Sequence, residues 1–114
     1  MNGDENSRSL FPGALEMMVL QTLRREPMHG YALAQSIKQT SRDFLQVEEG
    51  SLYPALQRML KEGWVAAEWR MSTRNRRIRI YRITPAGRKH LQREVSSFER
   101  MLEGIAHVMR PSES

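Results

Sequence analysis

A long basic stretch is the part of this sequence whose residue types point most directly to a chemistry. From Trp69 to Arg93 the chain has no aspartate or glutamate, yet it carries nine arginines and lysines. These are Arg70, Arg74, Arg76, Arg77, Arg79, Arg82, Arg88, Lys89 and Arg93. A guanidinium group can bridge phosphate oxygens, and positive charges without a counter-charge repel one another until a polyanion or a partner neutralises them. The stretch therefore favours nucleic acid over a merely solvated surface.

Residues able to hold a metal or to catalyse a reaction show no comparable pattern. His29, His90 and His107 lie on different predicted elements and lack metal-ligand spacing. Cysteine is absent, which removes a thiolate zinc site and a disulfide framework. There is no nucleophile motif and no phosphate-cradling glycine loop, and Glu48 with Glu49 suits the N-terminus of a helix. We therefore expect no metal, no cofactor and no enzymatic activity.

The overall composition predicts one folded, soluble and basic domain. The 114 residues are 27% charged and 39% hydrophobic, and the sequence pI is about 10.2. No apolar run approaches the roughly 20 residues that span a bilayer, and residues 1–9 lack the apolar stretch of a signal peptide. We expect a cytoplasmic protein without a membrane partner and with flexible tails at 1–9 and 111–114.

Three helical patterns precede the basic stretch, each marked by apolar residues that recur every three or four positions. The first covers about 12–25 and ends before Pro27, the second ends near Ser41, and the third ends at Gly63. The apolar positions are Leu15, Met18, Val19, Thr22 and Leu23 in the first, Tyr31, Leu33, Ala34 and Ile37 in the second, and Leu52, Leu56, Met59 and Leu60 in the third. His29 and Gly30 are predicted to form a short connection between the first two helices.

The outer face of the third predicted helix is polar and aromatic. It contains Ser51, Tyr53, Pro54, Gln57, Arg58 and Lys61. Ser51 is a plausible N-cap, which would place Pro54 in the first turn, where amide hydrogens lack intrahelical partners; a start two residues earlier is equally compatible. A solvated face would more often consist of Glu and Lys, so this face predicts a binding surface, although Tyr53 also suits the core.

Two short alternating segments, about 65–70 and 78–83, predict strands joined by a loop over 71–77. The loop has no glycine, and Asn75 is its residue best suited to a positive φ angle. Its basic, mobile tip carries Arg74, Arg76 and Arg77, and Trp64 and Trp69 are expected to anchor the hairpin in the core. Three helices followed by a hairpin predict a mainly α fold, the winged helix-turn-helix, over residues 10–83. Its third helix would enter the major groove of DNA while the hairpin, or wing, flanks it.

One long helix is predicted after the hairpin, over 84–110, with Thr84 as N-cap and Pro85 at its first position. Its apolar residues recur in alternate steps of four and three and so form a heptad seam: Leu91, Val95, Phe98, Leu102, Ile105 and Met109. One helix cannot bury such a seam, so we expect it to be the dimerisation helix of a homodimer. Phe98 is also a candidate lining residue of a small-molecule pocket between the subunits.

Three motifs that occur in this order resemble the PadR family of bacterial winged-helix transcriptional regulators. They are MHGYAL at 28–33, EGSLYPALQRMLKEGWV at 49–65 and RRIRIYRITPAGRKHL at 76–91. The resemblance covers about residues 10–110, and the single helix after the hairpin is similar to the subfamily with a short C-terminal region. The chain departs from the family at Asn75, where glycine is usual, and at Ile78 and Ile80, where basic and aromatic residues are usual.

The resemblance implies a homodimeric repressor that binds a near-palindromic operator and is released by a ligand or a stress signal. It assigns DNA contact to Ser51, Tyr53, Pro54, Gln57 and Arg58 on the recognition helix, to Arg74, Arg76 and Arg77 on the wing, and to Tyr31 beside the phosphate backbone. Gln57 suits adenine and Arg58 suits guanine in the major groove, whereas the wing arginines suit the backbone or a narrow minor groove.

The residues alone leave two other functions open. An RNA-binding winged helix would use the same basic hairpin without needing the heptad seam, and a protein-interaction winged helix would use the charge for an acidic partner. Arg88, Lys89 and Arg93 stand apart in either case, because they begin the last helix and are expected to be solvated or paired with acids such as Glu94 or Glu99.

Overall fold

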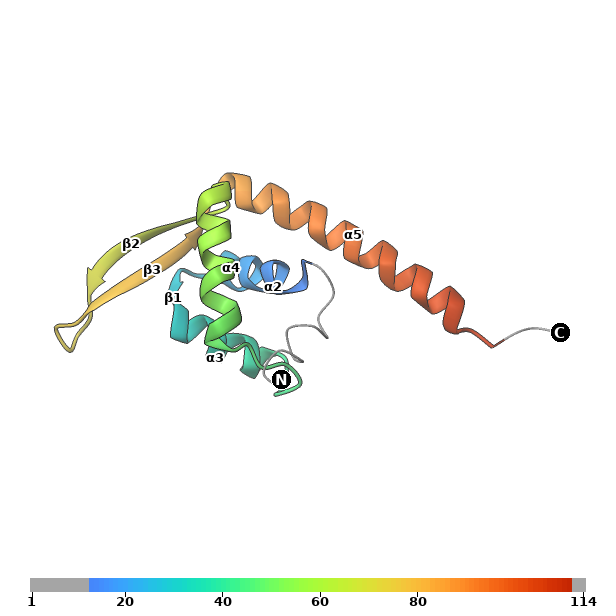
Figure 1. Cartoon of the computed structure of the whole chain (residues 1–114), viewed down its shortest axis with the longest axis horizontal. Helices are drawn as coiled ribbons and strands as arrows, with labels where there is room; N and C mark the ends of the chain where they lie inside the picture. Colours follow the sequence, from blue (N-terminus) through green and yellow to red (C-terminus); the bar gives the residue numbers. More distant parts are fainter. Residues whose placement is uncertain (1–12, 112–114) are drawn as a thin grey trace.

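The computed structural model describes residues 13–111, which form a small helical core with two projections (Figure 1). In chain order the elements are α2 (Ala14–Arg25), β1 (Met28–His29), α3 (Gly30–Thr40), α4 (Glu49–Glu62), β2 (Val65–Met71), β3 (Arg77–Ile83) and α5 (Pro85–Met109). The β2–β3 hairpin and α5 leave the core in opposite directions, which explains principal extents of 67 × 33 × 23 Å. The predicted N-terminal tail, residues 1–9, and all but the first residue of the tail 111–114 lie outside the described residues.

The core lies where α2, α3 and α4 meet. Its fully buried side chains are Val19, Leu20, Leu23, Leu33, Leu52, Leu56 and Met59, and Val65, Tyr81 and Ile83 at the base of the hairpin complete it. On α3 and α4 the buried residues Leu33, Ile37, Leu52, Leu56 and Met59 lie three or four positions apart within each helix, as the apolar periodicity predicted. Tyr31 was wrongly placed on the apolar face of the second helix, because it is 61% exposed. Thr22 is buried on α2, and its hydroxyl donates a hydrogen bond to the carbonyl of Met18 at 2.8 Å, so the buried polar group has a partner.

The sheet has one strand more than the predicted hairpin. Met28 and His29 pair antiparallel with Tyr81 and Ile80, which gives the strand order β1-β3-β2. The expected connection at His29 is therefore a short strand, and His29 also caps α3, because its Nδ1 accepts a hydrogen bond from the amide of Ala32 at 3.2 Å. Two residues are too few to show a period, so only the distant partner strand reveals β1.

The third helix begins earlier than a Ser51 cap would place it. Glu48 is the N-cap residue of α4, and its carbonyl accepts hydrogen bonds from the amides of Ser51 and Leu52. The expectation of a Ser51 cap was wrong, because the N-cap lies three residues earlier, and the alternative start two residues earlier was close to it. Pro54 therefore lies in the second turn, where it withholds an amide hydrogen from the carbonyl of Gly50. Gly50 is exposed, so water can satisfy that carbonyl.

The hairpin tip is held by hydrogen bonds of Ser72. Its Oγ accepts from the amides of Arg74 and Arg76, each at 3.2 Å, and its own amide donates to the carbonyl of Arg76 at 2.7 Å. Asn75 takes the positive φ angle that the sequence predicted, at 61°. The expectation that Trp69 anchors the core was wrong, because its side chain is 56% exposed, whereas Trp64 is half-buried and stacks on His90 with ring centroids 3.5 Å apart.

Thr84 joins the hairpin to α5 as the predicted cap. Its Oγ1 accepts a hydrogen bond from the amide of Gly87 at 3.0 Å and donates to the carbonyl of Gly63 at 2.6 Å. Gly87 is buried against the backbone of Trp64, where a Cβ would overlap the Trp64 carbonyl oxygen. The start of α5 is therefore fixed to the end of α4.

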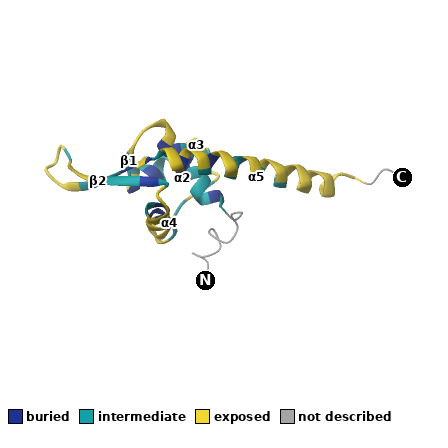
Figure 2. Ribbon diagram, turned by 90° about the horizontal axis from the view of Figure 1, so that it is seen from above, coloured by how far each residue is buried: buried dark blue, intermediate teal, exposed yellow. Residues whose placement is uncertain are grey.

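The heptad seam of α5 is covered only along its first half. Leu91 is buried and Val95 packs against the core, whereas Leu102, Ile105 and Met109 are 45%, 39% and 74% exposed. Figure 2 shows the outer part of α5 extending beyond the core with mostly exposed residues. No helix in the described part of the chain is long and apolar enough to cross a membrane.

Candidate nucleic-acid interface

The face of α4 opposite the core is open to solvent. Leu52, Ala55, Leu56 and Met59 point into the core, while the exposed side chains of the other face are Tyr53, Pro54, Gln57, Arg58 and Lys61, with Ser51 half-buried at its start. One helix thus divides its residues between holding the fold and presenting polar groups. The exposed set combines amide, guanidinium, ammonium and phenol groups, which suit both base edges and phosphates.

Tyr53 lies across the first residue of α3. A Cβ at Gly30 would meet the Tyr53 hydroxyl oxygen at 2.6 Å, so the absence of a side chain at Gly30 is what lets the ring lie there. Tyr53 is 39% exposed, so it packs between two helices while part of the residue stays accessible to solvent. Burial raises the pKa of Tyr53, and the nearby Glu49 and Tyr81 raise it further, so the phenol stays neutral and able to donate a hydrogen bond.

Tyr31 stands at the same end of α3, directly after Gly30. Tyr31 is 61% exposed. Its ring stacks on that of His29, the residue that caps the helix, with ring centroids 6.5 Å apart. Tyr31 and Tyr53 thus present phenol groups beside a helix N-terminus, where a helix dipole favours anions.

Arg58 is paired with an acid that the sequence pattern did not reveal. Its Nε and Nη2 donate to Oε2 of Glu16 on α2 at 3.3 and 3.2 Å. The Arg58 side chain is 60% exposed, and exposed pairs of this kind contribute about 0–1 kcal/mol. A guanine edge or a phosphate can therefore compete with Glu16 for the guanidinium. Glu16 lies 42 positions away in the sequence, so no local pattern relates the two residues.

The basic stretch is divided by the fold into a wing and a helix. Arg74, Arg76, Arg77 and Arg82 are exposed on the hairpin, and within residues 13–111 none of them forms an ion pair. Arg70 differs, because it pairs with Glu68, the acid that immediately precedes the stretch, at 2.6 Å. Arg88, Lys89 and Arg93 are exposed on α5, which leads away from the hairpin (Figure 1). Of the two expectations for these three residues, solvation agrees with their exposure, whereas no pair with Glu94 or Glu99 is found within residues 13–111, where Glu94 approaches His90 at 3.7 Å.

Two residues of the wing surface were missing from the predicted site. Trp69 and Arg79 stand opposite each other on β2 and β3, and the Arg79 guanidinium carbon lies 5.6 Å from the centre of the Trp69 ring. Arg79 belonged to the basic stretch, but strand alternation separated it from the tip arginines. Trp69 was assigned to the core of the hairpin, and only the folded structure shows that its side chain is exposed.

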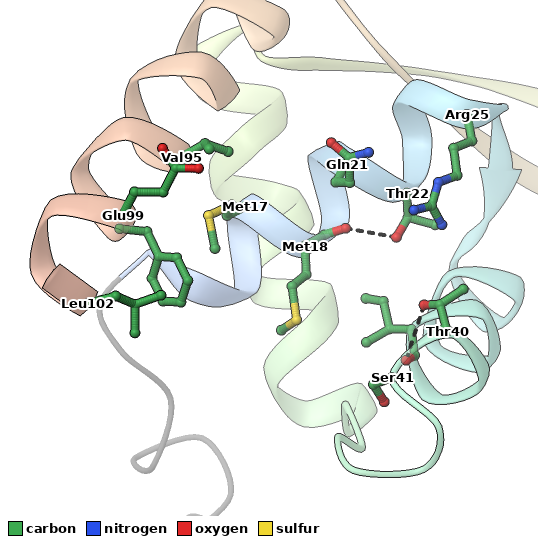
Figure 3. A pocket seen from close by; sticks show the side chains of 12 residues that line it. Met17, Met18, Gln21, Thr22, Arg25, Thr40, Ser41, Val95, Glu99 and Leu102 are labelled. Atoms are coloured by element: carbon green, nitrogen blue, oxygen red, sulfur yellow. Dashed lines mark hydrogen bonds between the residues drawn. The ribbon is translucent and has the colours of Figure 1, made fainter. Parts of the chain in front are cut away.

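An open groove of about 520 Å³ runs along α2 between α5 and the end of α3 (Figure 3). Its walls are mostly apolar, with Met17, Met18, Val95 and Leu102 among them, and Arg25 and Glu99 are charged residues on its rim. Phe98, the candidate lining residue of a pocket between subunits, lines this groove within the single chain. It also lines a smaller cavity of about 170 Å³ beside Gly13. No group of three histidines or acids in the described residues could hold a metal ion.

Comparison with known proteins identifies the family. The model of the transcriptional regulator PadR-like family matches residues 19–93. A protein of transposon TN4556 from Streptomyces fradiae is 36% identical over 98 residues, which are 86% of this chain and only 27% of that protein. The transcriptional regulator Rv3488 of Mycobacterium tuberculosis is 33% identical over 92 residues, covering 81% of this chain and 82% of that one.

The fold agrees with the same family. A crystal structure of a PadR family transcriptional regulator from Eggerthella lenta superposes with a TM-score of 0.77 at 29% identity, covering 89% of this chain and 86% of that one. Within residues 13–111, four helices, of which the C-terminal one is long, and a small antiparallel sheet form the winged-helix arrangement of these proteins. Proteins of this family regulate transcription and are not enzymes. The chain is a transcriptional regulator that belongs to the PadR-like family.

Proposed function

We propose that this regulator is a sequence-specific DNA-binding repressor that binds a near-palindromic operator as a homodimer. The observation that carries the proposal is the exposed polar face of α4, whose opposite face is buried, beside the wing residues Arg74, Arg76 and Arg77, which form no ion pair within residues 13–111. A helix held this firmly by its apolar side can present Gln57 and Arg58 to base edges without rearranging. The repressor role follows from the resemblance of the whole chain to the family.

The helix and the wing would contribute different parts of the binding free energy. Gln57 can pair with adenine and Arg58 with guanine in the major groove, where each base pair presents a distinct pattern of donors and acceptors. Arg74, Arg76 and Arg77 would contact the backbone or a narrow minor groove, where they gain affinity by releasing counterions from any sequence. Tyr31, Ser51, Tyr53, Pro54 and Lys61 would fix the position of the helix on the backbone.

The homodimer would form through the outer half of α5. Leu91 and Val95 are already occupied within the chain, so the partner subunit would cover Phe98, Leu102, Ile105 and Met109. Fully burying such a side chain stabilises the dimer by about 1.5–3 kcal/mol. In a two-fold interface each residue contributes from both subunits. The apolar groove lined by Phe98 continues into this region, which makes it a candidate site for a small-molecule effector. A chromosome-binding regulator of a bacterium would act in the cytoplasm.

Selection of the purified protein on a pool of random duplex DNA tests the proposal. We expect enrichment of a site with two related halves about one helical turn apart, since each subunit presents one α4. Enrichment of no two-fold symmetric site would overturn the operator proposal. A parallel selection on random RNA tests the RNA-binding alternative, because an RNA-binding winged helix would enrich sequences from the RNA pool and none from the DNA pool. Binding to neither pool would favour a protein partner for the basic wing.

A further inference from the structure

The exposed Trp69 of the wing is in contact with the guanidinium groups of two arginines. The guanidinium carbon of Arg77 lies 4.6 Å from the centre of the Trp69 ring, and that of Arg79 lies 5.6 Å from it. The Arg79 guanidinium also lies 5.8 Å from the ring of Tyr81. These distances fall within the roughly 6 Å range in which a cation is attracted to the negative face of an aromatic ring. Trp69 therefore contacts a guanidinium group from each of two successive positions on the same face of β3.

Trp69, Arg77, Arg79 and Tyr81 form an aromatic and arginine array along one face of the hairpin, and this face continues into the core. Successive cross-strand pairs on that face are Val65 with Ile83, Ala67 with Tyr81, Trp69 with Arg79 and Met71 with Arg77. Val65, Tyr81 and Ile83 are buried, whereas Trp69 and Met71 are more than half exposed. Tyr81 thus anchors the inner end of the array to the core, and the charge lies toward the tip.

The cation–π contacts hold Arg77 and Arg79 without neutralising their charge. An ion pair such as Arg70 with Glu68 fixes a guanidinium but also neutralises it. Within residues 13–111 neither Arg77 nor Arg79 has such a carboxylate partner. The Nε of Arg79 is buried without a hydrogen-bond acceptor, so aromatic contact rather than hydrogen bonding holds this end of the group. Stacking on a ring orders the guanidinium plane while the N–H groups at its edge remain donors.

We propose that Trp69 is a positioning residue that holds Arg77 and Arg79 in place for contact with neighbouring phosphates of duplex DNA. The proposal rests on the DNA-binding function proposed above. A long arginine side chain loses rotamer entropy when it becomes fixed. A wing that fixes two arginines before binding therefore loses less entropy on contact with DNA. It follows that Arg77 and Arg79, rather than the tip residues alone, form the ordered part of the phosphate-binding surface.

The test compares Trp69→Leu with Trp69→Phe, and uses Met71→Leu as a control because Met71 is an equally exposed apolar residue on the same face. Duplex affinity is measured at several salt concentrations, and thermal unfolding checks that every variant is folded. We expect Trp69→Leu to weaken operator binding by at least about ten-fold, because both arginines lose their aromatic support in each of two subunits. Trp69→Phe and Met71→Leu should stay within about threefold of the wild type. Relaxation of the arginine Nε signals in the free protein should show Arg77 and Arg79 ordered in the wild type and mobile in Trp69→Leu.

A double variant separates positioning from direct contact. When Arg77 and Arg79 are both alanine, adding Trp69→Leu should cause no further loss of affinity, because the tryptophan then has nothing to position. An equal loss in that background would show that Trp69 itself contacts DNA and would overturn the proposal. Wild-type affinity in Trp69→Leu, or failure of Trp69→Phe to retain binding, would also overturn it while leaving DNA binding intact. A wild-type protein that binds no duplex at all would overturn both proposals together.

Discussion

At the scale of single residues, the contact between Gly30 and Tyr53 decides how α3 and α4 meet. Replacing Gly30 with alanine would put a Cβ 2.6 Å from the Tyr53 hydroxyl and 2.9 Å from its ring carbons, so the ring must move. We expect Gly30→Ala to lower the free energy of unfolding by about 1–3 kcal/mol and to weaken operator binding. Denaturant titration and duplex affinity measure the two effects.

Gly50 provides the control for that substitution. It lies in the first turn of α4, is exposed, and has no atom within 4 Å of an added Cβ. Gly50→Ala should therefore leave stability unchanged or raise it by up to about 1 kcal/mol, because alanine suits a helix better than glycine. Equal destabilisation by both substitutions would show that the Tyr53 contact is not what matters at Gly30.

The predictability of single site residues depends on whether their neighbours are close in sequence. The outward face of α4 follows from helical periodicity, so the sequence predicted that Gln57, Arg58 and Lys61 point away from the core, and they are exposed. The Glu16 partner of Arg58 and the exposure of Trp69 were not found, because both depend on where distant elements come to lie. Local pattern predicts which way a side chain points, but not which group it meets.

At the scale of elements, α4 and the wing should separate specificity from affinity. We expect combined replacement of Arg74, Arg76 and Arg77 by alanine to weaken binding to every duplex and to flatten its dependence on salt, since fewer counterions are released. Gln57→Ala should instead change which base is preferred at one position in each half-site, with a cost of about 1–3 kcal/mol for the best site. Binding to the selected operator and to scrambled duplex over a salt series distinguishes these outcomes. If the two variants respond alike, the proposed division is wrong.

The junction between the hairpin and α5 gives a second prediction at this scale. Thr84 caps α5 and also bonds to the Gly63 carbonyl, so Thr84→Ala should lower the free energy of unfolding by about 1–2 kcal/mol. Thr84→Ser keeps the hydroxyl and should lose much less. A melting comparison of the two variants tests the role of the hydroxyl, and equal losses would assign the effect to the methyl group instead.

Elements were predictable in proportion to their length. The long amphipathic patterns of α2, α4 and α5, with Thr84 and Gly63 at their ends, show in the sequence because each helix repeats its signal over several turns. The two-residue β1 has no repeat to detect, and its hydrogen bonds are to a strand about 50 residues away. The start of α4 was uncertain because its N-cap residue, Glu48, makes no side-chain capping bond.

At the scale of the whole molecule, α5 extends beyond a core that covers only its first half. The sequence showed one continuous seam, but it did not show that Leu91 and Val95 would be covered by the same chain while Leu102 and Ile105 remain exposed. That division depends on the length of α5 relative to the core, which is a property of the assembled fold. The outer half of α5 is therefore the part of the seam for which a partner subunit is proposed.

A charge at Leu102 tests that requirement. Leu102→Glu would place a carboxylate at the centre of the proposed two-fold interface, where it would be removed from water without an opposite charge. We expect the variant to be a folded monomer by light scattering and to bind a full operator no better than a half-site, because two half-sites about 34 Å apart need both subunits. Folding should be preserved, since Leu102 is 45% exposed in the single chain.

His107→Glu is the matched control, because it adds a carboxylate to the same helix at an exposed position away from the seam. A helix turns about 100° per residue, so His107 lies roughly 140° around the axis from Leu102 and would stay in solvent in the dimer. The control should remain dimeric and bind the operator as the wild type does, since DNA contacts are proposed for α4 and the wing. A dimer that survives Leu102→Glu would mean that the subunits meet elsewhere, whereas loss of the dimer in both variants would point to added negative charge rather than to the seam.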